Sequence, residues 1–190
     1  MHDSLLHTLW PTVAKALLAA NVELLCDTSS LEALQNLSPS PNNLSTHVKP
    51  STPDSYETEH LSLTLSVLSV PSLSAAMEHI NAHSSHHTDS IVTEDESHAS
   101  QFCRGVDSAG TFVNASTRFA DGFRYGFGTE VGISTGRIHA RGPVGLEGLV
   151  TYKYVMRSKG KEGHIVSEFG TEEGRKKFKH EKIITGALPF

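Results

Sequence analysis

The residues best suited to chemistry gather in one stretch, VNASTRFADGFRYG, which runs from residue 113 to residue 126. It begins as a strand and continues as a loop rich in hydroxyls, aromatic rings, arginine and glycine. An arginine can bind a carboxylate or a phosphate through two parallel hydrogen bonds, and a glycine lets the backbone approach a ligand closely. We therefore predict that this loop forms one wall of an active site.

The distribution of positive charge supports a site for a small anion. Residues 1–117 contain only three lysines and arginines, whereas four arginines follow between residues 118 and 141: Arg118, Arg124, Arg137 and Arg141. A protein that binds nucleic acid usually presents a broader basic face, so we expect no nucleic-acid partner. Arginines among glycines and hydroxyls favour recognition of phosphate or carboxylate. The alternative is that some of them pair with acidic neighbours: Asp121, Glu130 and Glu147.

A histidine-rich stretch, HINAHSSHH, raises the possibility of a metal site. His79 and His83 are four residues apart and would share one face of a helix. No cysteine or carboxylate completes a ligand set nearby, so we interpret the stretch as a polar helix face that runs into a solvated turn, and we expect no metal.

The run GFGTEVG, from Gly126 to Gly132, resembles a dinucleotide-binding fingerprint only loosely, since its glycine spacing differs and no acidic residue follows at the usual distance. We interpret it as backbone that can approach a ligand. The two cysteines, Cys26 and Cys103, have no neighbouring base or cation cluster, which predicts two structural thiols in a reducing compartment.

The composition is that of a globular protein of 190 residues with a net charge of −5 and 37% hydrophobic residues. No apolar run approaches the ~20 residues that span a bilayer. The first residues, MHDSLLHTLWP, lack the lysine or arginine of a signal peptide. We expect a soluble cytoplasmic protein with no membrane partner.

The elements that must hold this loop alternate along the chain. Apolar periodicity predicts helices over residues 4–20, from 29 (a capping box at Ser29–Glu32), from 72 and over 96–105, and strands over 22–25, 61–67, 88–95 and 109–115. A loop rich in proline and serine is expected over 36–55, and a further strand over 149–157. Alternating strands and helices predict an α/β fold with parallel strands, in which ligands bind beyond the carboxyl ends.

From Glu59 to Met156 the sequence resembles the gamma-glutamyl phosphate reductases, also called glutamate-5-semialdehyde dehydrogenases, and its form is similar to the fungal branch. The most specific part is the run VDSAGTFVNASTRFADGFRYGFGTEVGISTGRIHARGPVGLEGLVTYKY, residues 106–154. Nearly all of it follows the family pattern without a gap, although Thr129 stands where the family usually has alanine.

The resemblance implies an aldehyde dehydrogenase-like catalytic domain, a three-layer αβα fold with a mostly parallel sheet. Residues 1–148 would be part of that domain, 149–156 a strand for homo-oligomerisation and 157–190 a charged C-terminal tail. The implied reaction is the NADPH-dependent reduction of L-glutamyl 5-phosphate to L-glutamate 5-semialdehyde in proline biosynthesis. In it a cysteine thiolate attacks the acyl phosphate, and a hydride reduces the resulting thioester.

The family's nucleophile lies in a Cys-Asn-Ala-x-Glu-Thr-Leu-Leu stretch that this sequence does not contain, and neither Cys26 nor Cys103 matches it. In the family the nucleotide-binding domain lies further upstream, and we expect it to be absent from this chain too. We therefore expect an N-terminally truncated chain that is inactive alone and supplies no catalytic residue. The alternative is a non-catalytic fragment that binds a small anion or takes part in assembly of that enzyme.

The resemblance does assign binding roles. Glu59 aligns with the superfamily's glutamate that contacts the nicotinamide ribose; without the resemblance it would be interpreted as an exposed acid before a strand. Six residues lie where the family's substrate loops would be: Asn114, Ser116, Thr117, Arg118, Phe127 and Gly128.

Overall fold

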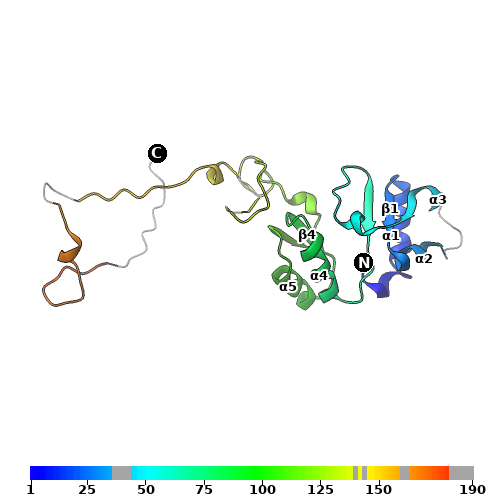
Figure 1. Cartoon of the computed structure of the whole chain (residues 1–190), viewed down its shortest axis with the longest axis horizontal. Coiled ribbons are helices and arrows are strands. Elements are labelled where there is room, and N and C mark those ends of the chain that lie inside the picture. The colour runs from blue at the N-terminus through cyan, green and yellow to red at the C-terminus, as the bar shows by residue number, and fades with distance from the viewer. Residues whose placement is uncertain (36–43, 139–140, 143–144, 159–162, 180–190) are drawn as a thin grey trace. The chain divides into compact units, whose positions relative to one another are not determined.

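The computed structural model describes residues 1–35, 44–138, 141–142, 145–158 and 163–179. The chain divides into two compact units, Met1–Val150 and Thr151–Phe190. Figure 1 colours them from blue at the N-terminus toward red at the C-terminus. No helix in the described part of the chain combines the length and the apolar character needed to cross a membrane.

The first sheet of the larger unit has three parallel strands in the order β2-β1-β3. They are β1 (Glu23–Cys26), β2 (Val48–Pro50) and β3 (Thr64–Val67). Leu24 of the central strand lies between Val48 and Leu65 of its neighbours. Helices α1 (Trp10–Ala19) and α2 (Thr28–Gln35) pack against this sheet.

The core of this sheet comes from one face of each element. In α1 the residues at helical spacing are Trp10, Ala14 and Leu18, and all three are buried. They pack in one cluster with residues of β1, α2 and β3: Leu24, Cys26, Ala33, Leu34 and Val67. The indole Nε1 of Trp10 donates to the carbonyl of Ser30 at 2.9 Å, which satisfies its polar group in the core.

Both ends of α1 and the start of α2 follow local rules. Pro11 stands at the start of α1, where its missing N–H is harmless. The helix ends at Ala19, and Asn21 beyond it has a left-handed φ of 58°, while the amide of Val22 donates to the carbonyl of Leu17 at 3.0 Å. The prediction of a capping box at Ser29–Glu32 was wrong: the cap of α2 is Asp27, whose Oδ1 accepts from the amide of Ser30 at 3.1 Å.

The second sheet pairs β4 (Thr88–Ile91) with β5 (Gly110–Val113), again in parallel. Helices α4 (Leu73–His83) and α5 (Glu96–Gly105) precede and follow β4. Serine and aspartate caps, Ser72 and Asp95, begin them as the sequence patterns require. The predicted alternation of parallel strands and helices is confirmed.

Two segments differ from the expectation. Of the predicted loop, residues 36–43 lie outside the described residues, whereas the remainder contains regular structure: α3 (Leu44–His47), β2 and a 3-10 helix at Pro53–Tyr56. Residues 150–158 carry no helix or strand within the described chain, so the strand at 149–156 stays a prediction.

Candidate functional site

The loop predicted to bind substrate leaves the carboxyl end of β5, as the sequence indicated. Asn114 follows the last strand residue, Val113, with a left-handed φ of 52°. Its side-chain oxygen accepts from the amide of Thr93 at 2.9 Å, and its side-chain nitrogen donates to the carbonyl of Thr93 at 2.8 Å. Both polar groups of this amide therefore tie the loop to the segment that follows β4.

The next residues form a short exposed 3-10 helix, Thr117–Phe119. Ser116 caps it, because its Oγ accepts from the amide of Arg118 at 3.2 Å. An open cavity of about 380 Å³ lies beside it. The residues lining this cavity are Thr111, Phe112, Val113, Ala115, Phe119, Arg124 and Tyr125.

Three of the four clustered arginines pair with acids. Arg124 contacts Asp121 at 3.1 Å, while Arg137 and Arg141 both contact Asp107. Only for Arg118 do the described residues offer no ion-pair partner. Sequence reasoning anticipated Asp121 but missed Asp107, which lies 34 residues before Arg141 and carries no local signal of the contact.

Phe127 and Gly128 belong to a tight turn farther along this loop. Tyr125 and Phe127 stack with ring centroids 6.1 Å apart and an interplanar angle of 15°. The φ of Gly128 is 78°, which residues with a side chain rarely adopt. Gly145 lies so close to the backbone of Phe127 that a Cβ at that position would overlap it. The turn therefore depends on glycine in both places.

Glu59 lies elsewhere, in a second cavity of about 750 Å³. The residues that line it all carry a polar side-chain group: Tyr56, Glu57, Thr58, Glu59, His83, Ser84, Ser85, His87 and Thr135. His83 contacts Glu57 at 2.6 Å across this surface. Glu59 itself is exposed, so its carboxylate is accessible to a ligand. A carboxylate among hydroxyls suits the hydroxyls of a ribose.

The structure thus brings the predicted residues together only in part. Asn114, Ser116, Thr117 and Arg118 follow one another beyond β5, and Phe127 and Gly128 lie on the same loop. None of these six residues lines the cavity of about 380 Å³, and none of them lines the cavity of about 750 Å³ that Glu59 borders. One residue of the long loop, Thr135, does reach the cavity of Glu59.

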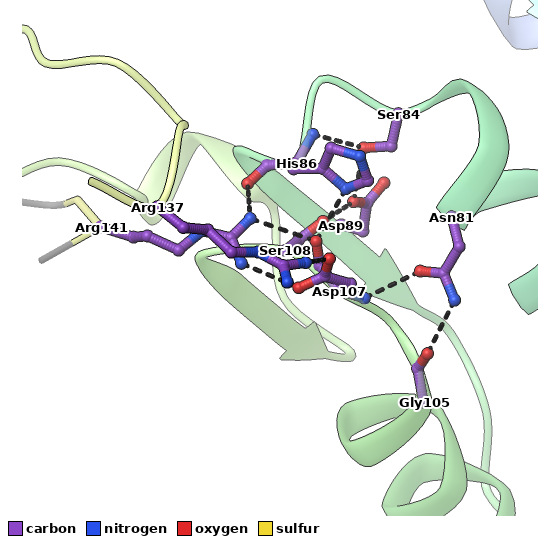
Figure 2. A network of polar contacts seen from close by, with 9 residues as sticks. All are labelled: Asn81, Ser84, His86, Asp89, Gly105, Asp107, Ser108, Arg137 and Arg141. Carbon is purple, nitrogen blue, oxygen red and sulfur yellow. Dashed lines mark hydrogen bonds and ion pairs between the residues drawn. The ribbon is translucent and has the colours of Figure 1, made fainter. Parts of the chain in front are cut away.

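A polar network holds the loop near the amino ends of β4 and β5 (Figure 2). Arg141 donates to the carboxylate of Asp107 at 2.9 Å and to the carbonyl of His86 at 3.0 Å. Asp107 is also tied to α4, since its amide donates to Asn81 at 2.8 Å. The sequence did not predict this network, although Asp107 lies within residues 106–154, the part that most resembles the family.

Cys26 does not have the environment of an activated nucleophile. Both cysteines are free, and Cys26 is buried in the core of the first sheet. Burial raises the pKa of the Cys26 thiol to about 11, so it is protonated at neutral pH. Burial also lowers the pKa of His79, with help from neighbouring His83. Among the described residues no group of three or more potential ligands could hold a metal ion.

Relatives of known name match most of the chain. A probable gamma-glutamyl phosphate reductase of Schizosaccharomyces pombe is 47% identical over 183 residues, which cover 96% of this chain and 39% of that protein. The gamma-glutamyl phosphate reductase of Saccharomyces cerevisiae is 55% identical over 128 residues, 67% of this chain and 27% of that protein. No protein-family model matches the chain.

A solved structure agrees with these relatives. The crystal structure of gamma-glutamyl phosphate reductase from Thermotoga maritima superposes with a TM-score of 0.73 at 37% identity, over 85% of this chain and 37% of that one. The match confirms the expected α/β fold with parallel strands. The chain spans about two fifths of the length of the relatives that it matches.

Proposed function

The chain is homologous over nearly its whole length to part of the gamma-glutamyl phosphate reductases, and we propose that it forms the substrate and nicotinamide side of such an enzyme. The reaction is the NADPH-dependent reduction of L-glutamyl 5-phosphate to L-glutamate 5-semialdehyde, an oxidoreductase step of proline biosynthesis. The observation that carries this proposal is 47% identity over 183 residues, which include the entire arginine- and glycine-rich loop.

The substrate role falls to the loop beyond β5. Arg118 is exposed and has no ion-pair partner among the described residues, so its guanidinium can bind a carboxylate or phosphate. The hydroxyls of Ser116 and Thr117 lie beside it, and Asn114 sets the direction in which the loop leaves the strand. Phe127 and Gly128 supply an aromatic wall and close backbone approach on the same loop.

The cofactor role falls to Glu59. Its exposed carboxylate in a polar cavity fits a contact with the ribose hydroxyls of NADPH, and the neighbouring hydroxyls of Thr58 and Thr135 add further hydrogen-bonding groups. NADPH, when bound, supplies the hydride of the reaction. Glu59 would hold and orient the nicotinamide end without taking part in a proton transfer.

The thiolate that the reaction needs does not come from these residues. Cys26 is buried and its pKa is raised to about 11, so it remains protonated. We propose that the 190-residue chain has no reductase activity by itself. The absence of an activated thiol among these residues also supports a second candidate function: the chain would be a non-catalytic fragment that binds a small anion or takes part in assembly of the enzyme.

Two further proposals concern the whole enzyme. Residues 149–156 expose the apolar side chains of Leu149, Val150, Tyr152, Tyr154, Val155 and Met156. Four of them stand at every second position, which suits a strand that joins a partner's sheet in a homo-oligomer. A cytoplasmic location is supported by two cysteines that are both free.

Binding by the isolated chain tests the substrate role. We expect added L-glutamate, a probe for the amino acid end of the substrate, to shift the NMR signals of residues 114–118. Arg118→Ala should abolish these shifts, whereas Arg104→Ala, which removes an exposed arginine from α5, should not. Shifts that survive in Arg118→Ala would contradict the assignment.

A further inference from the structure

Asp107 uses nearly all of its polar groups within the protein. Its amide donates to Oδ1 of Asn81 at 2.8 Å, and its carbonyl lies 2.7 Å from Nδ1 of His86. Its carboxylate pairs with both Arg137 and Arg141. Figure 2 shows the two arginines reaching Asp107 from the loop while Asn81 reaches it from α4. Asp107 therefore joins the loop to the second sheet and its helix.

This network differs from an ordinary surface ion pair, which contributes little. The side chain of Arg141 is only 19% exposed, and its second terminal nitrogen donates to two carbonyls, those of His86 and Asp107. The buried Nε of Arg141 has no partner among the described residues. A guanidinium taken out of water in this way depends on the Asp107 carboxylate for its charge balance.

The contacts of Asp107 with the two arginines lie close in sequence to a residue of the Glu59 cavity. Arg137 is two residues after Thr135, which lines that cavity. Between them the amide of Gly136 donates to Oγ of Ser134 at 3.0 Å and closes a tight turn. A fixed position for Arg137 therefore limits where Thr135 can lie.

We propose that Asp107 is a positioning residue: through Arg137 and Arg141 it holds residues 130–138 so that Thr135 completes the wall of the Glu59 cavity. The effect on NADPH binding rests on the proposed function, but the effect on the loop does not. Asp107 itself touches neither ligand nor reacting atoms.

Backbone 15N relaxation of the full chain tests the positioning. In Asp107→Asn, which keeps the backbone contacts and removes the charge, the order parameters of residues 130–138 should fall toward about 0.6 or below, while those of β4 and β5 stay near about 0.85. Asp107→Glu should restore most of the order. Arg137→Gln, at a largely exposed side chain, should act in the same direction without endangering the fold.

The outcomes separate the two claims. Unchanged order parameters at residues 130–138 in both Asp107→Asn and Arg137→Gln would overturn the positioning, as would an equal loss of order in β4 and β5. The second readout is NADPH titration of the Schizosaccharomyces pombe protein with its matching segment replaced by this chain: weaker binding in Asp107→Asn that Asp107→Glu rescues supports the link to Glu59. Order parameters that fall as expected while NADPH binding of that chimera is unchanged would leave the contacts of Asp107 in place and contradict their link to the Glu59 cavity.

Discussion

At the scale of single residues, several polar groups that were predicted to bind a ligand make contacts within the protein instead. Asn114, predicted to bind substrate, uses both ends of its amide on Thr93, and three arginines of the predicted anion site pair with Asp107 or Asp121. Of the four clustered arginines, only Arg118 has no ion-pair partner among the described residues. The sequence could identify the loop and its residue types, but a contact across 34 residues, such as Arg141 with Asp107, leaves no local pattern to detect.

Asp27 offers a residue-scale prediction with a pH dependence. Burial would raise the pKa of Asp27, but hydrogen bonds from Ser30 and Ser69 outweigh it and hold that pKa below its ordinary value. A carboxyl whose pKa is lower in the folded state stabilises the fold above its unfolded pKa, near ~4, and that stability is lost as the pH falls through the folded pKa.

We expect Asp27→Ala to lower the free energy of unfolding by about 1 kcal/mol at pH 7, because α2 loses its N-cap. The difference from the wild type should shrink as the pH falls below ~4. Urea titration followed by the fluorescence of Trp10, the sole tryptophan, measures both. Glu94→Ala, at an exposed acid, is the control, and a difference that grows at low pH would contradict the assignment.

At the scale of elements, apolar periodicity predicted most helices and strands correctly, whereas a strand that depends on pairing with a distant segment was missed. Helices α1, α4 and α5 and strands β1, β4 and β5 follow from apolar spacing and capping residues. Strand β2 was missed because it has three residues, one of them lysine and one proline, inside a segment with the composition of a loop. Its strand conformation is decided by pairing with β1, which no short window of sequence reveals.

The end of α1 gives an element-scale prediction. Asn21 has a left-handed φ of 58°, which glycine adopts without strain and alanine does not. We expect Asn21→Gly to match or exceed the wild-type stability and Asn21→Ala to lose about 1 kcal/mol. Thermal unfolding followed by circular dichroism gives the stability of each variant. Equal stability of Asn21→Gly and Asn21→Ala would show that the left-handed backbone at this position is not a constraint.

At the scale of the whole molecule, the two units differ in the interactions that stabilise them. Every buried core side chain of the described residues lies before residue 151. The smaller unit has local contacts of its own, such as Lys176 with Glu168 at 2.6 Å. The chain corresponds to only 39% of the Schizosaccharomyces pombe protein. Its role therefore has to be measured together with the rest of such an enzyme.

We expect a chain that ends at Val150 to unfold at the same urea concentration as the full chain, because the smaller unit contributes no described core side chain. The fluorescence of Trp10 reports the transition of the first sheet in both. A clear shift of the midpoint to lower urea would show that residues 151–190 stabilise the larger unit.

The most direct measurement replaces the matching segment of the Schizosaccharomyces pombe protein with this chain and monitors the reverse reaction, NADP⁺ reduction by L-glutamate 5-semialdehyde in the presence of phosphate. We expect the chimera to be active, the isolated chain to be inactive, and Arg118→Ala in the chimera to raise the KM for semialdehyde or phosphate while Arg104→Ala does not. A folded chimera without activity, or an isolated chain that catalyses the reaction, would contradict the account.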